Sequence, residues 1–263
     1  MPFTLAHPAA AVPLRRFGLV LSALVVGSMA PDFPYFLPWM PLDQFGHTLL
    51  GVVWFCVPAG LTVLWLFHRF LKLPLISLFP RSHQERLMTI APEFRFGPWK
   101  RLGVILLSLA LGALTHLGWD LITHPHGWMV RHWPVLRTVI WGTRWTTFRL
   151  YFVLQYGSTF VGSALMAHWY LKWLRNARSA AGGLPAQLSP PVKACTILVA
   201  GLGALILAAA HAFVSTPSLT SVRSMEQFAR YGVMVTIWVA LAILGVYGLL
   251  WHLFLARHAA KRI

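Results

Sequence analysis

The chain has 263 residues, of which 57% are apolar and only 11% are charged, and its mean hydropathy is +0.65. Soluble domains carry about 25% charged residues, so this composition excludes a disordered chain, a coiled coil and an ordinary soluble enzyme. Lys and Arg outnumber Asp and Glu by 22 to 6, giving a net charge of +16. The basic residues fall between apolar runs, which indicates a bilayer with anionic headgroups as the partner and no nucleic acid.

Apolar runs of about 20 residues predict an all-α, polytopic membrane helix bundle. The first run, 17–30, has only 14 residues, so it either spans the membrane or returns as a short helical hairpin with residues 5–14. We favour the hairpin, because the run is too short to cross comfortably and Pro8 and Pro13 interrupt the preceding stretch. The hairpin places Arg15 and Arg16 in its bend. Five strong predicted spans follow at 49–68, 102–122, 150–171, 194–214 and 231–256.

These runs divide the chain into three predicted segments. Residues 1–171 form a membrane domain that carries a His/Asp cluster. Residues 172–193, which contain several Gly and Pro, form a cytoplasmic linker, and residues 194–263 form a C-terminal two-helix membrane hairpin.

The distribution of Lys and Arg predicts the orientation. If 17–30 spans, 16 of the 22 basic residues lie on one side, in the N-terminus and in 69–101, 172–193 and the residues after 256. If 17–30 is a hairpin, 14 still oppose eight. Both alternatives place the C-terminus in the cytoplasm, and Asp43 and the connector 123–149 toward the outer face of a cell membrane.

The stretch 115–126, at the end of the second strong span, is the richest in polar side chains. His116 and Asp120 are four residues apart and therefore share a helix face. His124 extends the same face, although Pro125 favours the end of the helix there. An imidazole and a carboxylate on adjacent turns can bind one metal ion.

Asp32 and His47 are the other two predicted members of the site that contains His116 and Asp120. Asp32 follows an apolar segment and His47 precedes the next span, at the membrane face where His116 and Asp120 lie. We therefore expect these four side chains to converge, with His7, His124 and His126 as further candidates. The hairpin alternative brings His7 beside Asp32, whereas a true span would place them about 30 Å apart.

Four or more nitrogen and oxygen ligands without a thiolate suit Zn²⁺, Mn²⁺, Fe²⁺ or Mg²⁺, and the histidines favour zinc or manganese. A charged side chain within a span is costly and is by default a sign of function. The alternative is that these side chains are amphipathic residues at the membrane interface.

Four stretches of the sequence resemble a bacterial family of integral membrane proteins of unknown function. They are Met-Pro-Phe-Thr-Leu-Ala-His-Pro-Ala-Ala at the start, Gly-Ser-Met-Ala-Pro-Asp-Phe, Gly-His-Thr, and Thr-His-Leu-Gly-Trp-Asp. The resemblance covers most of residues 1–160, and that family is distantly similar to membrane-bound metal-dependent hydrolases. Those hydrolases carry an N-terminal His, a Pro-Asp and a His-Ser/Thr, so the resemblance implies His7, Asp32 and His47 as metal ligands.

The chain also departs from those hydrolases. Phe33 stands where they have a second acid, and Gly46 where they have an Arg. The His-x-x-x-Asp of His116 and Asp120 resembles, over a short pattern, the zinc-dependent phospholipase C and nuclease fold.

Two hypotheses of function follow. The first is a bacterial inner-membrane enzyme that uses a divalent metal held by His7, Asp32, His47, His116 and Asp120 to hydrolyse a phosphoester or lipid-linked substrate. Asp120 or His124 then carries the proton. The second is a non-catalytic transporter or assembly partner whose polar cluster binds an ion or a proton.

Overall fold

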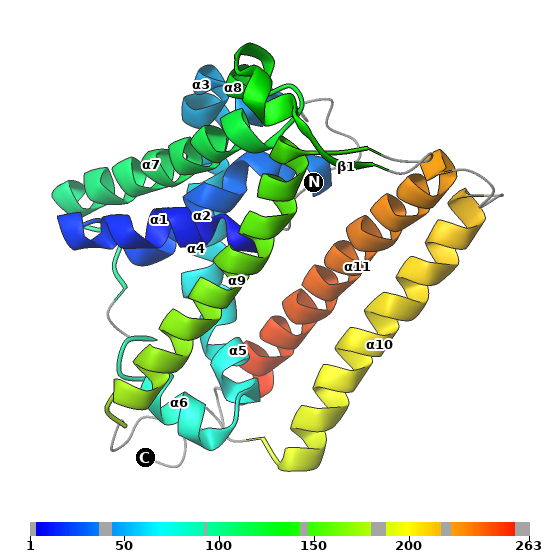
Figure 1. Ribbon diagram of the computed structural model, residues 1–263. Coiled ribbons are helices and arrows are strands. Elements are labelled where there is room, and N and C mark those ends of the chain that lie inside the picture. Colours follow the sequence, from blue (N-terminus) through cyan, green and yellow to red (C-terminus); the bar gives the residue numbers. More distant parts are fainter. Residues whose placement is uncertain are drawn as a thin grey trace. The chain divides into compact units, whose positions relative to one another are not determined.

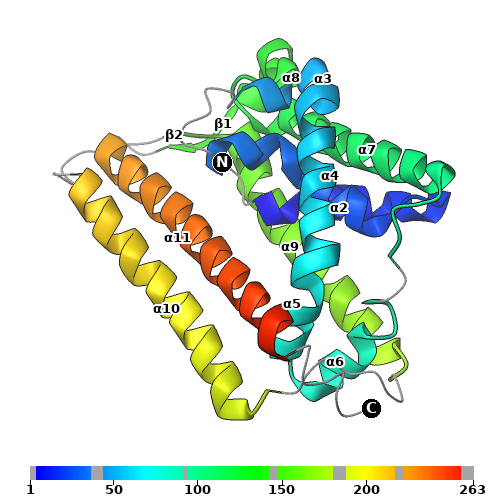
Figure 2. The same ribbon diagram turned by 180° about the vertical axis from the view of Figure 1, so that it is seen from behind.

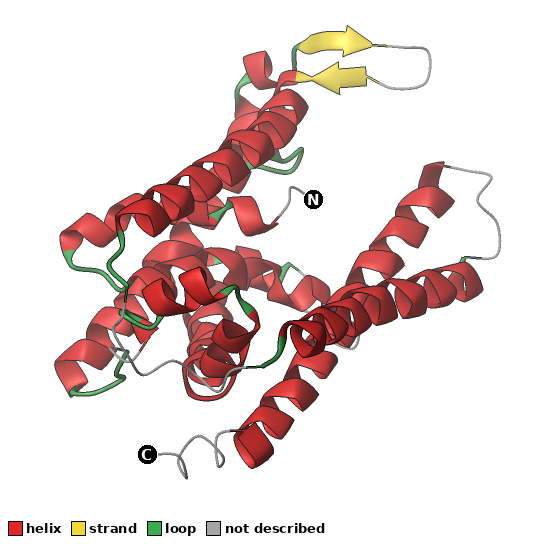
Figure 3. Cartoon of the chain, turned by 90° about the horizontal axis from the view of Figure 1, so that it is seen from below, coloured by secondary structure: helices red, strands yellow, loops and turns green. Residues whose placement is uncertain are grey.

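Helices dominate the computed structural model, which describes residues 4–36, 44–91, 94–142, 147–179, 188–216 and 222–255 (Figure 3). Among the described residues, five helices are long and apolar enough to cross a membrane, which confirms the predicted multi-pass helical class. They cover Leu49–Leu78, Trp99–His132, Leu150–Asn176, Pro190–Ser215 and Gln227–Leu253. Asp43 and the residues after 256, on which part of the predicted orientation rests, lie outside the described residues.

Short helices make up the N-terminal part of the chain. They are η1 (Thr4–Ala6), α1 (Pro8–Ala11), η2 (Val12–Phe17), α2 (Leu21–Met29) and η3 (Ala30–Phe36). The chain reverses at Gly18, whose φ of 79° lies in the left-handed region that glycine adopts without strain. Arg15 and Arg16 are exposed at this bend. Helix α2 has nine residues, too few to cross a bilayer. Of the two alternatives, a span or a helical hairpin, residues 4–36 therefore form the hairpin.

The next span is a continuous run of helical segments. After η4 (Phe45–His47) and the extended residue Thr48, it comprises α3 (Leu49–Gly51), the π-helical turn η5 (Val52–Cys56), α4 (Val57–Leu66), the π-helical turn η6 (Phe67–Leu71) and α5 (Lys72–Leu78). The Thr48 hydroxyl accepts from the Gly51 N–H and caps the start of the helix. The helix therefore begins directly after His47, which fixes that residue at the end of a span.

Two compact units divide the chain. The first contains residues 1–65 and 95–176, and the second contains residues 66–94 and 177–263. The second unit includes α6 (Arg81–Leu87), α10 (Pro190–Ser215), α11 (Val222–Leu250) and η9 (Trp251–Leu255). Helices α10 and α11 pack side by side (Figure 1). The predicted segments 1–171, 172–193 and 194–263 stay a prediction, and residues 180–187 of the predicted linker are not described.

The first unit is built around the contact between α2 and α7 (Trp99–Thr123), which lie alongside each other in Figures 1 and 2. Glycines allow the two helices to approach closely: a Cβ on Gly27 would lie 2.2 Å from the Leu109 carbonyl oxygen, and one on Gly112 would lie 2.4 Å from that of Leu24. The Ser108 hydroxyl accepts from the Val20 N–H at 3.0 Å, at the start of α2. This packing fixes residues 27–32 against the last turns of α7.

The remaining elements of the first unit follow α7 in the chain. They are α8 (Trp128–His132), η8 (Pro134–Arg137), the antiparallel strands β1 (Val139–Gly142) and β2 (Thr147–Arg149), and α9 (Leu150–Asn176). The β-hairpin was not predicted. Helix α9 contacts η1 and α1, and a Cβ on Gly162 would lie 2.9 Å from the Ala6 carbonyl oxygen.

Candidate metal centre

Four side chains converge where three elements of the first unit meet. Asp32 lies in η3, His47 ends η4, and His116 and Asp120 lie one turn apart near the end of α7. His47 Nε2 lies 3.4 Å from Asp32 Oδ1 and 3.5 Å from Asp120 Oδ2. His116 Nε2 lies 3.6 Å and 3.3 Å from the same two oxygens. Two nitrogens and two oxygens thus alternate around a four-atom ring, which we call the His/Asp ring.

Four of the six distances within the His/Asp ring match the spacing of neighbouring ligands around a tetrahedral ion. The sets with ligand atoms all within 4.8 Å of one another are His47, His116 and Asp120, and His7, Asp32 and His116. Zinc binds nitrogen and oxygen ligands at about 2.0–2.1 Å, so a regular tetrahedron holds neighbouring ligand atoms about 3.4 Å apart. The four nitrogen–oxygen distances of the ring span 3.3 to 3.6 Å. The donor set, two imidazoles and two carboxylates, is one that zinc and manganese accept.

The tautomer of His116 gives independent support for a cation in the ring. His116 Nδ1 lies 2.8 Å from the Ser28 carbonyl oxygen, which can only accept, so Nδ1 carries a proton. In the neutral imidazole, Nε2 then has a lone pair that faces two carboxylate oxygens. That contact is repulsive unless a cation lies between them, either a proton on Nε2 or a metal ion. A backbone carbonyl behind a histidine is also the usual support of a metal ligand.

In each of the two ring carboxylates, the oxygen that is not part of the ring lies close to a side chain from outside the ring. The Thr4 hydroxyl donates to Asp32 Oδ2 at 2.7 Å. His124 Nδ1 lies 3.1 Å from Asp120 Oδ1. The side-chain amide of Gln155, on α9, lies 3.4 Å from His124 Nε2, and the Thr123 hydroxyl lies 3.2 Å from His124 Nδ1.

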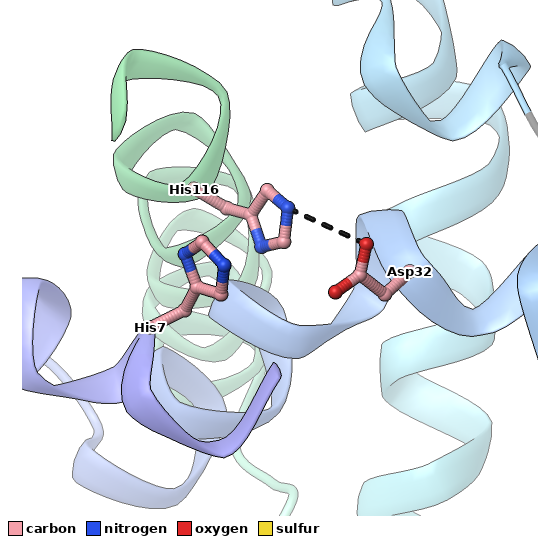
Figure 4. A group of neighbouring side chains, drawn as sticks. All are labelled: His7, Asp32 and His116. Carbon is pink, nitrogen blue, oxygen red and sulfur yellow. Dashed lines mark ion pairs between the residues drawn. The ribbon is translucent and has the colours of Figure 1, made fainter. Parts of the chain in front are cut away.

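His7 lies on the buried side of the ring. Its imidazole stacks on that of His116, with 3.8 Å between the ring centroids, and Figure 4 shows the two rings side by side with the Asp32 carboxylate facing His116. Ligand atoms of His7, Asp32 and His116 all lie within 4.8 Å of one another. His7 is therefore beside Asp32, as the hairpin alternative requires, and it can bind an ion that the two share.

Burial sets the charge of the groups that lie outside the long helices. Desolvation, with the nearby His116 as a second cause, lowers the pKa of His7 to about 4, so this imidazole is neutral near pH 7, as a metal ligand must be. Burial opposes ionisation of Asp32, but hydrogen bonds from His47 and Thr4 and the charge of His116 outweigh it. The pKa of Asp32 is therefore below its ordinary value, and its carboxylate is ionised.

The sequence prediction and the structure can be compared residue by residue. The six predicted residues His7, Asp32, His47, His116, Asp120 and His124 lie together, and their role as ligands and proton carriers stays a prediction. His126 is exposed in the turn after α7, and no ion pair joins it to the ring in the described part of the chain. Thr4, Ser28 and Gln155 were not predicted. Gln155 could have been found from the sequence, because a polar amide within an apolar predicted span is a candidate site residue, and the structure buries it.

The fold and the site together define a multi-pass helical membrane protein with a mostly buried His/Asp ring at the ends of its helices. A family model described as "Domain of unknown function (DUF4184)" matches residues 1–256, and the chain belongs to this family. No curated protein and no solved structure matches the chain.

Proposed function

We propose that the protein is a membrane-embedded, metal-dependent hydrolase that acts on a phosphoester or lipid-linked substrate. The observation that carries the proposal is the His/Asp ring, with nitrogen–oxygen distances of 3.3 to 3.6 Å. The resident ion is zinc or manganese, and Asp32, His47, His116 and Asp120 would hold it, with His7 as a further candidate; a hydrolase needs one coordination position left open for water. A bound divalent ion supplies Lewis acidity and lowers the pKa of a water that it binds.

The residues of the chain supply the remaining functions of such a site. Asp32 and His116 are almost fully buried and fix the geometry, whereas His47 and Asp120 are partly exposed and admit water and substrate. His124 Nδ1 lies 3.1 Å from Asp120 Oδ1, and the His124 side chain is 28% exposed. It can therefore pass a proton between Asp120 and a leaving group that arrives from the exposed side.

The position of the ring favours the enzyme over a transporter. Intramembrane ion sites of transporters form at interruptions in the middle of helices. Here Asp32 follows α2, His47 precedes α3, and His116 and Asp120 belong to the last turns of α7. This arrangement suits a site at headgroup level. From the Lys and Arg distribution, we place it toward the outer face of a bacterial inner membrane, with the C-terminus in the cytoplasm.

Hydrolysis of two soluble probes by the detergent-purified protein tests the proposal. We expect zinc- or manganese-loaded protein to hydrolyse p-nitrophenyl phosphate or bis(p-nitrophenyl) phosphate, and a chelator to abolish the activity. His124→Ala should retain the metal and lose about 10²–10⁴-fold in rate, as for other general acid–base residues.

The matched control is His126→Ala, which removes an exposed histidine two residues further on and should leave the rate unchanged. If the metal-loaded protein hydrolysed neither probe nor a phospholipid, the enzyme would be excluded in favour of the ion-binding alternative. Equal rates for the two variants would remove His124 from the mechanism.

A further inference from the structure

Water and substrate can reach the His/Asp ring from one side. The side chains of His116 and Asp32 are 1% and 5% exposed, whereas those of His47 and Asp120 are 21% and 17% exposed. A substrate therefore approaches between the start of α3, where His47 lies, and the end of α7, where Asp120 lies. We call this partly exposed side of the ring the entrance.

The side of the entrance that follows His47 is apolar. Leu49, Leu50, Val53 and Trp54, on α3 and η5, are between 58% and 73% exposed, and they begin a helix that is long and apolar enough to cross a membrane. We call these four residues the apolar surface. In a bilayer such a surface contacts acyl chains.

The side of the entrance that follows Asp120 is basic and aromatic. The chain turns back onto the end of α7 at Gly127, where a Cβ would lie 2.6 Å from the Asp120 carbonyl oxygen. Helix α8 starts at the next residue and carries Trp128, which is 51% exposed, and the exposed Arg131. Arg137, also exposed, donates from Nε to the Val130 carbonyl oxygen at 2.8 Å, which ties its guanidinium to α8. We call Trp128, Arg131 and Arg137 the basic surface.

The two surfaces lie at the same end of the first unit. Helices α3 and α8 both lie at the end of the first unit at which α7 stops, as Figures 1 and 2 show. Between Asp120 and Glu226 the sequence contains no Asp or Glu, so acids on this part of the chain do not neutralise the arginines. An anionic group with an apolar tail matches this combination of charge and hydrophobicity.

We propose that the entrance binds an anionic phospholipid, with its phosphate headgroup on the basic surface and its acyl chains along the apolar surface. Arginine binds phosphate oxygens in bidentate fashion, and the indole of Trp128 suits the headgroup level of a bilayer. Gly127, which packs against the Asp120 carbonyl oxygen, joins the basic surface to the end of α7 that carries Asp120. The claim that this lipid is the substrate rests on the proposed function, whereas the claim that it binds here does not.

Native mass spectrometry of the whole protein with added lipids tests the binding. We expect phosphatidylglycerol to bind in preference to phosphatidylcholine with the same acyl chains. Because each Arg near a membrane surface strengthens the binding of anionic lipid, Arg131→Gln with Arg137→Gln should lower phosphatidylglycerol binding about tenfold or more, to the level of phosphatidylcholine. Arg131→Lys with Arg137→Lys should retain most of the preference.

The matched control removes the same charge at the other end of α7, with Lys100→Gln and Arg101→Gln, and it should bind phosphatidylglycerol like the wild type. Unchanged binding by the Arg131/Arg137 variant, or an equal loss in the Lys100/Arg101 control, would overturn the proposal. Glycerol phosphate should not displace the lipid. Displacement at equal concentration would identify a soluble phosphate as the ligand and overturn the lipid assignment.

Metal content measured on the same samples separates this proposal from the proposed function. The Arg131/Arg137 variant should keep its metal, and His116→Ala with Asp120→Ala should lose metal but keep its preference for phosphatidylglycerol. A wild type that binds the anionic lipid without metal would contradict the hydrolase alone. A wild type that holds metal without any lipid preference would contradict the lipid site alone.

Discussion

At the scale of single residues, three ring residues have a support behind the atom that faces the ring. Ser28 holds His116, Thr4 holds Asp32, and His124 lies behind Asp120. The sequence indicated the ring through the spacing of His116 and Asp120 and through two polar residues at helix ends. It could not indicate Ser28, because this support is a backbone carbonyl that any residue type provides. Its contact with His116 depends on the packing of α2 against α7.

The hydroxyl of Thr4 provides a test of this support. Thr4→Val keeps the shape of the side chain but removes the hydrogen bond to Asp32 Oδ2, so we expect metal affinity to fall about 10–100-fold, the usual cost of losing an outer partner of a ligand. Competition with a chelator of known affinity measures the change. Thr4→Ser keeps the hydroxyl and should bind metal like the wild type. Equal affinity in Thr4→Val would show that Asp32 does not depend on Thr4.

At the scale of elements, the search for apolar runs long enough to cross a membrane located the long helices correctly but placed some of their ends wrongly. The predicted span 102–122 corresponds to α7, Trp99–Thr123, but the span predicted at 49–68 continues to Leu78. A hydropathy criterion stops at the basic residues after 68, whereas the backbone hydrogen bonds continue through the π-helical turn η6. The paired strands β1 and β2 were missed inside a connector rich in Trp, although Val, Ile, Trp, Thr and Phe favour strands.

The contact between α2 and α7 is the element on which the ring depends. A Cβ at Gly112 would lie 2.4 Å from the Leu24 carbonyl oxygen and 2.8 Å from the Ser28 nitrogen. We expect Gly112→Ala to push α2 from α7, to move the Ser28 carbonyl away from His116, and to destabilise the protein by about 1–3 kcal/mol. Thermal unfolding in detergent and metal content are the readouts, and both should fall.

Gly118→Ala is the control on the same helix, because a Cβ at Gly118 meets nothing within 4 Å. It should match the wild type in unfolding temperature and in metal content. If the two variants behaved alike, close packing at Gly112 would not position the ring.

At the scale of the whole molecule, the distribution of basic residues predicts which face carries the site. Val135, on η8, and Ser82, on α6, are exposed positions in connectors that are predicted to lie on opposite sides. In a background with Cys56→Ala and Cys195→Ala, an impermeant maleimide should label Val135→Cys in intact cells, and Ser82→Cys only after permeabilisation. The reverse pattern would place the His/Asp ring toward the cytoplasm.

The metal content of the detergent-purified protein decides whether the His/Asp ring is a metal centre or a set of hydrogen-bonded side chains at the membrane interface. By elemental analysis, we expect the wild type and His126→Ala to hold about one equivalent of zinc or manganese. His116→Ala with Asp120→Ala, which removes two of the four ring residues, should hold none while it elutes as the same species in size-exclusion chromatography. Equal metal in the double variant and the wild type, or no metal in either, would contradict the metal centre.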